Sequence, residues 1–378
     1  MTIISSTYIH IPFCHHICHY CDFNKFYLKN QPVDEYLATL DQEMSLTFDL
    51  HPPGEMKTVF VGGGTPTALT PKQLEKLCQS ILARAGGQIE EFTFEANPGE
   101  LTEDKLRVLK EYGVNRLSLG VQSFDDDLLK AIGRTHQYED IVSSIDAAIR
   151  TGITNVSLDL IYSLPNQTVE DFKETLDIAL AFDLPHYSGY SLIVEPKTVF
   201  YNRLRKGQLP LPGEDTEASM YDVLMNTMAK KGISQYEISN FAKKGYESKH
   251  NLVYWSNEEY YGFGAGAHSY VKEVRRSNHG PLKKYMDPLE KGHLDYLEEH
   301  TTTVEERMEE EMFLGLRKVE GISVKRFNEK FNQNPFILYK GPLQELFEKG
   351  WVTHDEQYIK LTREGRFLGN EVFQYFLQ

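Results

Sequence analysis

Three of the four cysteines lie close together near the start of the chain. Cys14, Cys18 and Cys21 give the spacing C-x3-C-x2-C. Three thiolates at this spacing can bind an iron–sulfur cluster, and they leave one iron with an open position for another ligand. The loop is therefore predicted to be a site of metal chemistry.

Two other uses of these cysteines are weaker. A disulfide framework favours an oxidising compartment and a dispersed, even set of cysteines, which this chain does not have. A zinc site stays open, because four nearby histidines could supply a fourth ligand: His10, His15, His16 and His19. Cys78 follows helical apolar spacing and is predicted to be a small core residue.

A glycine run, Gly62-Gly-Gly-Thr65, is the second segment that suggests a ligand. Backbone without side chains can approach a ligand closely, and its carbonyls could accept hydrogen bonds from the amino group of an amino acid that chelates the open iron. A GGG run marks a simple tight turn about as often. Its position after the cysteines strengthens the first interpretation.

Short apolar runs alternate with amphipathic helical segments over the first two thirds of the chain. The predicted strands are Tyr8–Ile11, Thr58–Val61, Phe92–Glu95, Arg116–Val121, Val156–Ile161 and Tyr187–Val194. The predicted helices are Asp34–Phe48, Pro71–Ala85, Glu103–Tyr112, Tyr138–Thr151, Val169–Phe182 and Asp215–Lys230. This alternation is typical of an α/β fold with a parallel sheet that curls into a full or partial (β/α) barrel.

In such a barrel the chemistry lies on loops at the C-terminal ends of the strands. The cysteine loop follows the first predicted strand, the glycine run the second, Glu95-Ala-Asn-Pro98 the third and Gln122-Ser123 the fourth, while Asp159 lies near the end of the fifth. We therefore expect these residues to meet at one end of the barrel.

The last third of the chain has a different pattern. Residues 235–300 show weak periodicity and are expected to form an irregular connection. From Thr303 onward, helices around a short hairpin predict a small helical, winged-helix-like domain. Winged helices often bind DNA, but this segment has 11 Lys and Arg against 13 Asp and Glu, so a basic face is not apparent. We expect domains at 1–235, 236–302 and 303–378.

Charge and composition restrict the class of protein. The formal net charge of −15 disfavours a nucleic-acid partner held by phosphate contacts. The sequence has no signal-like start and no apolar run of membrane-spanning length, and 40% of its residues are hydrophobic. A cytoplasmic globular protein is expected.

The cysteine loop resembles that of the radical S-adenosylmethionine (radical SAM) superfamily, whose signature is C-x3-C-x2-C with an aromatic residue, here Tyr20, before the third cysteine. The wider run from Tyr8 to Phe23 resembles the HemN/HemW group, which contains oxygen-independent coproporphyrinogen III oxidases and haem chaperones in porphyrin metabolism. The resemblance implies a partial barrel of the radical SAM type, a [4Fe–4S] cluster held by the three cysteines, and SAM. It also implies that the C-terminal segment is a HemN-like accessory domain.

The resemblance further implies which residues bind SAM. The matching positions are Tyr8, Tyr20, Gly63, Gly64, Thr65, Glu95, Gln122, Arg134, Asp159 and Ile193. Arg134 could form a forked contact with the methionine carboxylate. Glu95, Gln122 or Asp159 could accept hydrogen bonds from the ribose hydroxyl groups of SAM. A surface ion pair is the alternative for Arg134.

A second site is suggested by the motif His250-Asn251-Leu-Val-Tyr254-Trp255. An imidazole can ligate haem iron, and the two aromatic rings could lie on the macrocycle. From the residues alone, a packing corner with a satisfied histidine is favoured. The resemblance reverses that order, because H-N-x-x-Y-W is a signature of the chaperone group. His268 is a weaker candidate.

Two functions remain, and whether the chain is an enzyme is left open. The first is a haem chaperone that delivers haem to recipient haem proteins, including membrane-associated ones, alone or as a homodimer. The second is a radical SAM coproporphyrinogen III oxidase. Three departures favour the chaperone, for which no catalytic residue is assigned: the oxidases carry a further cysteine where this chain has Phe23, they carry an N-terminal arm before the barrel, and the H-N-x-x-Y-W motif belongs to the chaperones.

Overall fold

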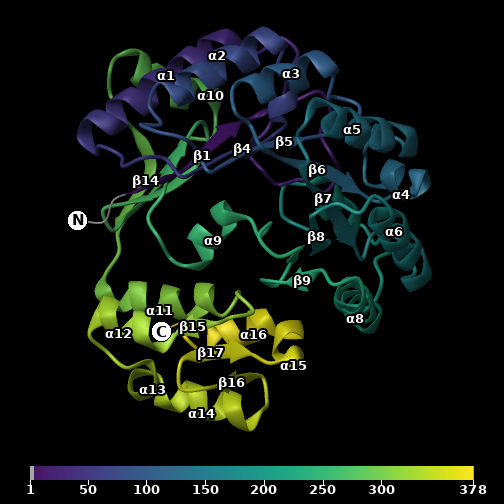
Figure 1. Cartoon of the computed structure of the whole chain (residues 1–378), viewed down its shortest axis with the longest axis vertical. Coiled ribbons are helices and arrows are strands. Elements are labelled where there is room, and N and C mark those ends of the chain that lie inside the picture. The colour runs from purple at the N-terminus through teal and green to yellow at the C-terminus, as the bar shows by residue number, and fades with distance from the viewer. Residues whose placement is uncertain (1–3, 378) are drawn as a thin grey trace.

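The core of the molecule is a curved, nine-stranded sheet with helices on its outer face (Figure 1). The computed structural model describes residues 4–377. In spatial order, the parallel strands are β11 (Tyr261–Phe263), β1 (Ser6–Ile11), β4 (Thr58–Gly63), β5 (Glu91–Ala96), β6 (Arg116–Gln122), β7 (Asn155–Tyr162) and β8 (His186–Ser191). Antiparallel β10 (Asn240–Ala242) and β9 (Ser234–Gln235) follow. In the described chain β11 and β9 are the edges, so the barrel is partial, as expected.

Helices connect the strands of the sheet, and most of them cover its convex face (Figure 1). They are α1 (Val33–Leu50), α2 (Pro71–Leu82), α3 (Glu103–Glu111), α4 (Asp126–Ala131), α5 (Tyr138–Thr151), α6 (Val169–Ala181), α7 (Val199–Arg205) and α8 (Glu214–Lys230), with the short 3₁₀ helix η1 (Pro66–Ala68) after β4. Local sequence fixes their ends. Thr70 and Gln73 form a reciprocal capping box at the start of α2, and Gly152, with φ of 85°, ends α5.

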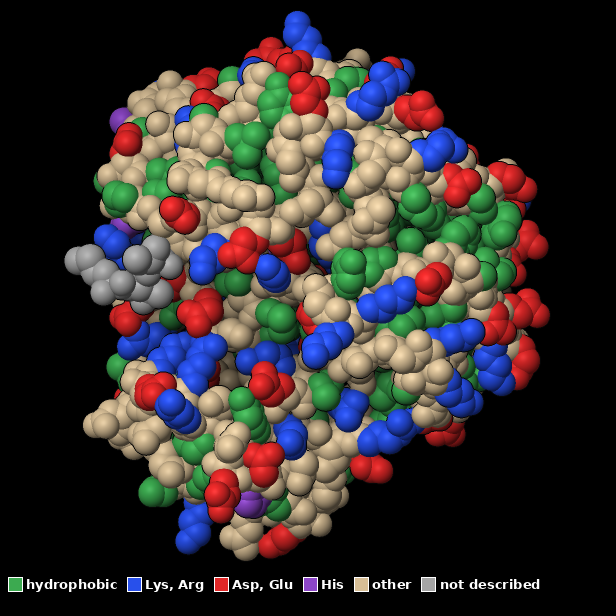
Figure 2. All heavy atoms as spheres, in the orientation of Figure 1, with side chains coloured by type: hydrophobic (Ala, Val, Ile, Leu, Met, Phe, Trp, Pro, Cys, Tyr) green, Lys and Arg blue, Asp and Glu red, His purple; other side chains and the backbone are tan. Residues whose placement is uncertain are grey.

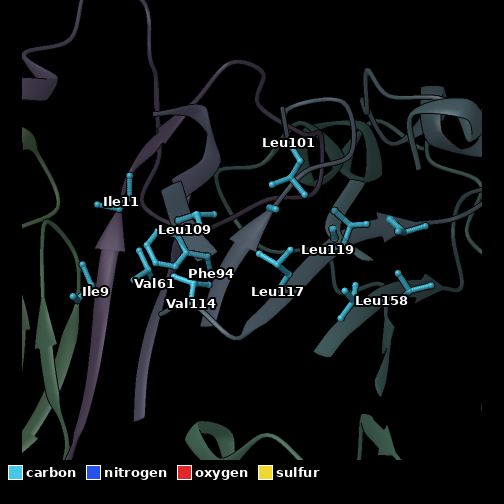
Figure 3. Packing of buried hydrophobic residues seen from close by; sticks show 14 of the residues in the cluster. Ile9, Ile11, Val61, Phe94, Leu101, Leu109, Val114, Leu117, Leu119 and Leu158 are labelled. Atoms are coloured by element: carbon cyan, nitrogen blue, oxygen red, sulfur yellow. The ribbon is translucent and has the colours of Figure 1, made fainter. Parts of the chain in front are cut away.

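The two faces of the sheet differ in character because side chains alternate along each strand. On β6, Leu117 and Leu119 pack outward into the large core beneath the helices (Figure 3). Arg116 and Ser118 occupy the alternate positions and face the concave side. The interior of the partial barrel is therefore polar, although most of its side chains are buried.

Residues 234–301 differ from the expected irregular connection. They supply β9, β10 and β11, the short helix α9 (Lys249–Trp255), helix α10 (Leu282–Glu290), and a separate three-stranded sheet of β12 (His268–Val271), β13 (Val274–Asn278) and β14 (Tyr296–Thr301). Phe241, Tyr261 and Tyr285 belong to the same core as the barrel. These strands are too short to give a periodic signal, and β11 is parallel to β1, its partner more than 250 residues earlier.

The C-terminal part forms a second, separate hydrophobic core. Its elements are α11 (Val304–Gly315), β15 (Ile322–Ser323), α12 (Val324–Phe331), α13 (Pro335–Leu338), α14 (Lys340–Glu348), β16 (Val352–His354), β17 (Tyr358–Leu361), α15 (Arg363–Phe367) and α16 (Gly369–Gln374). The described chain ends in the two short helices α15 and α16, which are separated by Leu368. A further parallel pair, β2 (Phe13–Cys14) and β3 (Phe26–Tyr27), brackets the cysteine loop.

Helix α9 lies inside the concave face, between the sheet and the C-terminal domain (Figure 1). Charged residues fasten the segment after α9 to that domain. Arg326 contacts Ser256 and Glu258, and the Lys330 ammonium donates to the Asn257 carbonyl at 3.0 Å and to the Glu311 carboxylate at 2.7 Å. Figure 2 shows acidic and basic side chains interspersed at the level of this boundary. No helix within residues 4–377 is long and apolar enough to cross a membrane.

Candidate functional site

The predicted strand-end residues meet in one cavity at the C-terminal ends of the parallel strands. The cavity has a volume of about 320 Å³. Its lining includes all three clustered cysteines and eight of the ten residues expected to contact SAM: Tyr20, Gly63, Gly64, Thr65, Glu95, Gln122, Arg134 and Asp159. The remaining two, Tyr8 and Ile193, do not line it. Tyr8 pairs with His10 behind the glycine run, and Ile193 is 65% exposed.

The backbone holds Cys14 more tightly than the other two cysteines. Cys14 ends β2, and its carbonyl accepts a hydrogen bond from the Leu28 amide at 2.8 Å. The Thr65 hydroxyl donates to the Cys14 sulfur at 3.5 Å. Burial raises the pKa of the Cys14 thiol to about 11 and also raises the pKa of Cys21. Both thiols must therefore lose their protons when they bind a metal.

The neighbouring histidines do not complete a compact metal site. His10 is buried, with one ring nitrogen paired with the Tyr8 hydroxyl and the other with the Asn24 carbonyl. His19 pairs with the Ala131 carbonyl at 3.1 Å. Among residues 4–377, no three His, Cys, Asp or Glu side chains are placed to hold a metal ion together. A cluster has a different requirement, because each thiolate binds a different iron atom.

The protein's own atoms explain why the glycine run must be glycine. A Cβ on Gly62 would lie 2.7 Å from the Glu95 carboxylate, and one on Gly63, where φ is +109°, would lie 2.3 Å from the His10 ring. A Cβ on Gly64 would approach the backbone at Pro12 and Phe13 to below 3 Å. The run therefore brings β4, the cysteine loop and Glu95 together at the cavity wall.

Two carboxylates lie on the concave side of the cavity. Glu95 accepts a hydrogen bond from the Gly63 amide at 2.8 Å, and burial raises its pKa to about 7. Asp159 accepts from the Ser118 hydroxyl at 2.8 Å and from the Ser157 hydroxyl at 3.2 Å. Burial raises the pKa of Asp159, while hydrogen bonds from Ser188 and Ser118 oppose that rise. Each carboxylate keeps acceptor capacity for hydroxyl or amino groups of a ligand.

Arg134 reaches the cavity from the turn after α4. Its Nη1 donates to the Asn97 side-chain oxygen at 2.5 Å, while its Nε is buried with no hydrogen-bond partner among the residues described. Gly120 leaves room for it, because a Cβ there would lie 2.9 Å from Nη2. The Arg134 guanidinium thus lies at the cavity wall with only part of its hydrogen-bonding capacity used. The structure does not place it in a surface ion pair.

Sequence reasoning assigned no ligand contact to several residues of the cavity wall. Asn97 bridges two residues that are expected to contact SAM. Its side-chain amide donates to the Thr65 hydroxyl at 2.9 Å, and its side-chain oxygen accepts from Arg134. Ser118, Tyr190 and Phe23 also line the cavity. Asn97 could have been found from its place in Glu95-Ala-Asn-Pro98 at a strand end. Ser118 and Tyr190 could have been found because side chains alternate between the two faces along β6 and β8, which places these two on the interior face.

The H-N-x-x-Y-W motif forms α9, away from this cavity. His250 is fully buried, and burial lowers its pKa to about 3. Its Nδ1 pairs with the Thr58 hydroxyl at 2.9 Å and its Nε2 with the Tyr254 hydroxyl at 2.8 Å. The ring stacks on Phe60 with centroids 5.4 Å apart. Both imidazole nitrogens thus have partners within the protein, as in a packing corner.

The other residues of the motif frame this corner. The Glu91 carboxylate accepts from the backbone amides of Lys249 and His250 and so caps α9. The Asn251 amide donates to the Ser248 hydroxyl, and Arg317 lies over the Trp255 ring at 4.7 Å. The Trp255 Nε1 is buried and has no hydrogen-bond partner in the described chain. His268 is exposed at the start of β12.

Comparison with known protein families decides the relationship. Residues 8–179 match the model of the radical SAM superfamily, and residues 302–368 match that of the HemN C-terminal domain. The chain is 52% identical over 376 residues, 99% of each chain, to a Bacillus subtilis protein named Heme chaperone HemW. The chain belongs to the HemW family of the radical SAM superfamily. A Heme chaperone HemW of Lactococcus lactis is 45% identical, over 99% of this chain and 97% of that protein. One of Escherichia coli is 32% identical, over 98% of each chain.

A solved structure confirms the fold expected for the HemW family. The coproporphyrinogen III oxidase HemN of Escherichia coli, described as a radical SAM enzyme, superposes with a TM-score of 0.85 over 98% of this chain and 89% of that one. The identity is 24%, so this likeness establishes the fold, a parallel-strand sheet with a C-terminal helical domain, and not the activity.

Radical SAM membership implies a [4Fe–4S] cluster and SAM, and the cavity residues fit both. Cys14, Cys18 and Cys21 line one wall as soft thiolate donors. Arg134 offers an unpaired buried N–H for a carboxylate, and Glu95 and Asp159 offer acceptors. The donor set thus suits a thiolate-bound cluster and a zwitterionic nucleoside ligand next to it.

Proposed function

We propose that this protein is a haem chaperone, which binds haem and delivers it to recipient haem proteins. In this proposal it carries a [4Fe–4S] cluster on Cys14, Cys18 and Cys21, and SAM in the adjoining cavity. The observation that carries the proposal is the 52% identity, over 99% of both chains, to a protein named Heme chaperone HemW.

The alternative is a coproporphyrinogen III oxidase, and Phe23 argues against it. Phe23 stands where the oxidases of the group carry a further cysteine; it lines the cavity, and the residue is 62% exposed. The likeness to the Escherichia coli oxidase is one of fold, at 24% identity. The oxidase therefore remains the second candidate.

The chain's own residues would hold and orient the cofactors. The three thiolates would bind the cluster, which when bound supplies redox chemistry beside SAM. Arg134, oriented by Asn97, would pair with the methionine carboxylate of SAM, and Tyr20 and Gln122 would complete that side of the cavity. Glu95 and Asp159 would accept hydrogen bonds from its amino and ribose groups.

For haem, we propose the H-N-x-x-Y-W helix, with His250, Asn251, Tyr254 and Trp255 as its contacts. Ligation of iron by His250 requires that Nε2 exchange its hydrogen bond to Tyr254 for the metal. In this proposal helix α9 shifts when haem binds, because His250 is fully buried in the described structure. The neutral imidazole is already the form that binds iron, because burial holds the pKa of His250 near 3.

We further propose that the protein acts in the cytoplasm, that its recipients include membrane-associated haem proteins, and that it works alone or as a homodimer. The net charge of −15 argues against nucleic acid as a partner.

An anaerobic assay distinguishes the two functions. The protein is reconstituted with iron and sulfide, then given SAM, a reductant and either coproporphyrinogen III or haem. We expect a Soret change on adding haem and no protoporphyrinogen. The matched control replaces Cys14, Cys18 and Cys21 with Ala, which should remove the cluster and leave haem binding at least partly intact. Formation of protoporphyrinogen by the wild type alone would establish the oxidase instead.

A further inference from the structure

The segment Gly264-Ala-Gly-Ala-His268 has no role in the proposed function, yet it contacts the cysteine loop. Asn24 follows Cys21 by three residues, and its amide nitrogen donates two hydrogen bonds. One goes to the Ala265 carbonyl at 2.8 Å and the other to the Gly280 carbonyl at 2.9 Å. These partners lie 241 and 256 residues further along the chain. One side chain thus joins the cysteine loop to the turn after β11.

A second set of hydrogen bonds supports the backbone of Asn24. The Asn24 carbonyl pairs with His10 Nε2 at 2.7 Å, and His10 Nδ1 pairs with the Tyr8 hydroxyl at 2.9 Å. A carbonyl can only accept, so Nε2 carries the proton and Nδ1 accepts from Tyr8. Burial lowers the pKa of His10 to about 4, which is consistent with this neutral tautomer.

The turn is shaped to receive Asn24. Gly266 has φ of +80°, and a Cβ there would lie 2.8 Å from the Asn24 Cβ. Gly264 has φ of +100°, and a Cβ there would lie 2.5 Å from the His10 carbonyl oxygen. Between them, the Tyr36 hydroxyl donates to the His10 carbonyl at 2.7 Å and accepts from the Ala265 amide at 3.0 Å. Gly266 is required because the turn lies directly against Asn24 of the loop, and Gly264 is required because the turn lies directly against His10 of β1.

Each cysteine has a different attachment to the rest of the fold. Cys14 is held by β2, and Cys18 is held through its neighbour His19, whose amide donates to the Ile132 carbonyl at 3.0 Å. The backbone of Cys21 itself makes only local contacts: its amide reaches the Cys18 carbonyl at 3.4 Å, and its carbonyl accepts from Lys25. Before Cys21, the Tyr20 side chain is hydrogen-bonded to Arg134. Asn24 is the nearest residue after Cys21 that is bonded to a distant, buried part of the structure.

We propose that Asn24 is a positioning residue for the iron–sulfur cluster, fixed by the turn at Gly264–His268 so that Cys21 is held at the right place relative to Cys14 and Cys18. The inference rests on the proposed function only in requiring that the three cysteines bind a cluster. It gives the glycine-rich turn a role at the cluster end of the sheet, independent of haem.

Two substitutions test the contact from its two sides. Asn24→Asp keeps the shape but replaces two N–H donors by a carboxylate that faces two carbonyls. Gly266→Ala places a methyl group against Asn24. Gly245→Ala is the matched glycine control, because Gly245 has φ of +89° and no described atom within 4 Å of its Cβ position. Asn115→Ala is the matched amide control, because Asn115 also makes two backbone hydrogen bonds, to Phe92 and Glu90, away from the loop.

Cluster retention and the unfolding of the apoprotein are measured on all five proteins. After anaerobic reconstitution, we expect the two test variants to lose iron to a chelator at least tenfold faster than wild type, and the electron paramagnetic resonance spectrum of the reduced cluster to change. Both controls should retain the wild-type spectrum. Thermal unfolding of the metal-free proteins should not separate the test variants from the controls.

Three results overturn the inference. Wild-type retention and spectrum in both test variants would show that Asn24 does not position the cluster. Cluster loss that follows the thermal stability of the apoprotein, in test and control variants alike, would reduce Asn24 to a general structural role. If wild type itself bound no cluster, the proposed cofactor assignment would fail, and the positioning role with it.

Discussion

Arg134 is hydrogen-bonded to Asn97 at the cavity wall, and this contact supports a quantitative prediction. Arg134→Lys should weaken SAM binding by the reconstituted protein about tenfold or more, because an ammonium cannot reproduce the forked contact of a guanidinium with a carboxylate. Anaerobic calorimetric titration with SAM measures this directly.

Arg107→Lys is the matched control for that measurement. Arg107 is 68% exposed and forms a surface ion pair with Asp104 on α3. This variant should bind SAM as the wild type does. Equal SAM affinity in the Arg134 and Arg107 variants would contradict the assignment of Arg134 to the methionine carboxylate.

His250 leads to a second prediction at the scale of single residues. Tyr254→Phe keeps the aromatic packing of residue 254 against His250 and Tyr260 but frees the Nε2 of His250. If iron binds at Nε2, the variant should bind haem several-fold more tightly, because a competing hydrogen bond worth about 1 kcal/mol is gone. Soret titration gives the affinity.

Two further variants make this result decisive. His250→Ala should lose specific haem binding, and Tyr246→Phe, at a tyrosine that is 41% exposed, should change nothing. Weaker haem binding in Tyr254→Phe together with unchanged binding in His250→Ala would show that His250 is not the iron ligand.

The sequence predicts residues of the cavity at the strand ends well where they belong to a short motif with fixed spacing. The cysteine loop, the glycine run and the strand-end carboxylates come together as expected. The partners of these residues were not predictable, because they are distant in sequence. Asn24 of the cysteine loop meets its partners only after β11 joins the sheet. The same holds outside the cavity, where the partner of His250, Thr58, lies 192 residues earlier.

At the scale of elements, the strands and helices of βα units are predictable and the short strands are not. The expected helix Tyr138–Thr151 is found with the same bounds, because a capping box and Gly152 fix its ends. In contrast, β11 has three residues, and its place beside β1 depends on pairing across almost the whole barrel domain. Local propensity carries no information about such a pairing.

Glu43 links several of these elements and predicts a pH dependence. The carboxylate on α1 is buried and accepts hydrogen bonds from the Gly264 amide at 2.8 Å, the Asn278 amide at 2.6 Å and the Tyr285 hydroxyl at 2.6 Å. Burial raises its pKa to about 7, from an ordinary value of 4.5. Between these two values the folded protein retains a proton that the unfolded chain has released.

The free energy of unfolding should therefore fall as the pH rises from 4.5 to 7, and Glu43 should account for at most about 3 kcal/mol of that fall. Glu43→Gln should flatten this part of the profile, although Glu95 will leave a slope of the same sign. Denaturant unfolding of the apoprotein at pH 5 and pH 8 tests this, with the exposed Glu305→Gln as control. An unchanged slope in the Glu43 variant would refute it.

At the scale of the whole molecule, two hydrophobic cores face each other across α9. The first core supports the cavity at the strand ends, and the second belongs to the C-terminal domain. The ends of α9 are held differently. Its N-terminus is capped by buried Glu91 of the sheet, while the segment that follows it is bonded to Arg326 and Lys330 of the C-terminal domain. A change in the packing of the C-terminal domain is therefore expected to move the H-N-x-x-Y-W motif and to leave the cysteine loop in place.

The central claim is that this chain carries haem, and haem titration followed by transfer tests it most directly. The anaerobically purified protein is titrated with haem and then mixed with the apo form of a b-type haem protein, while the Soret band is followed. We predict saturable binding at one haem per chain and transfer of that haem to the acceptor faster than from free haem at the same concentration. Absence of saturable binding in the wild type, with or without cluster and SAM, would contradict the account.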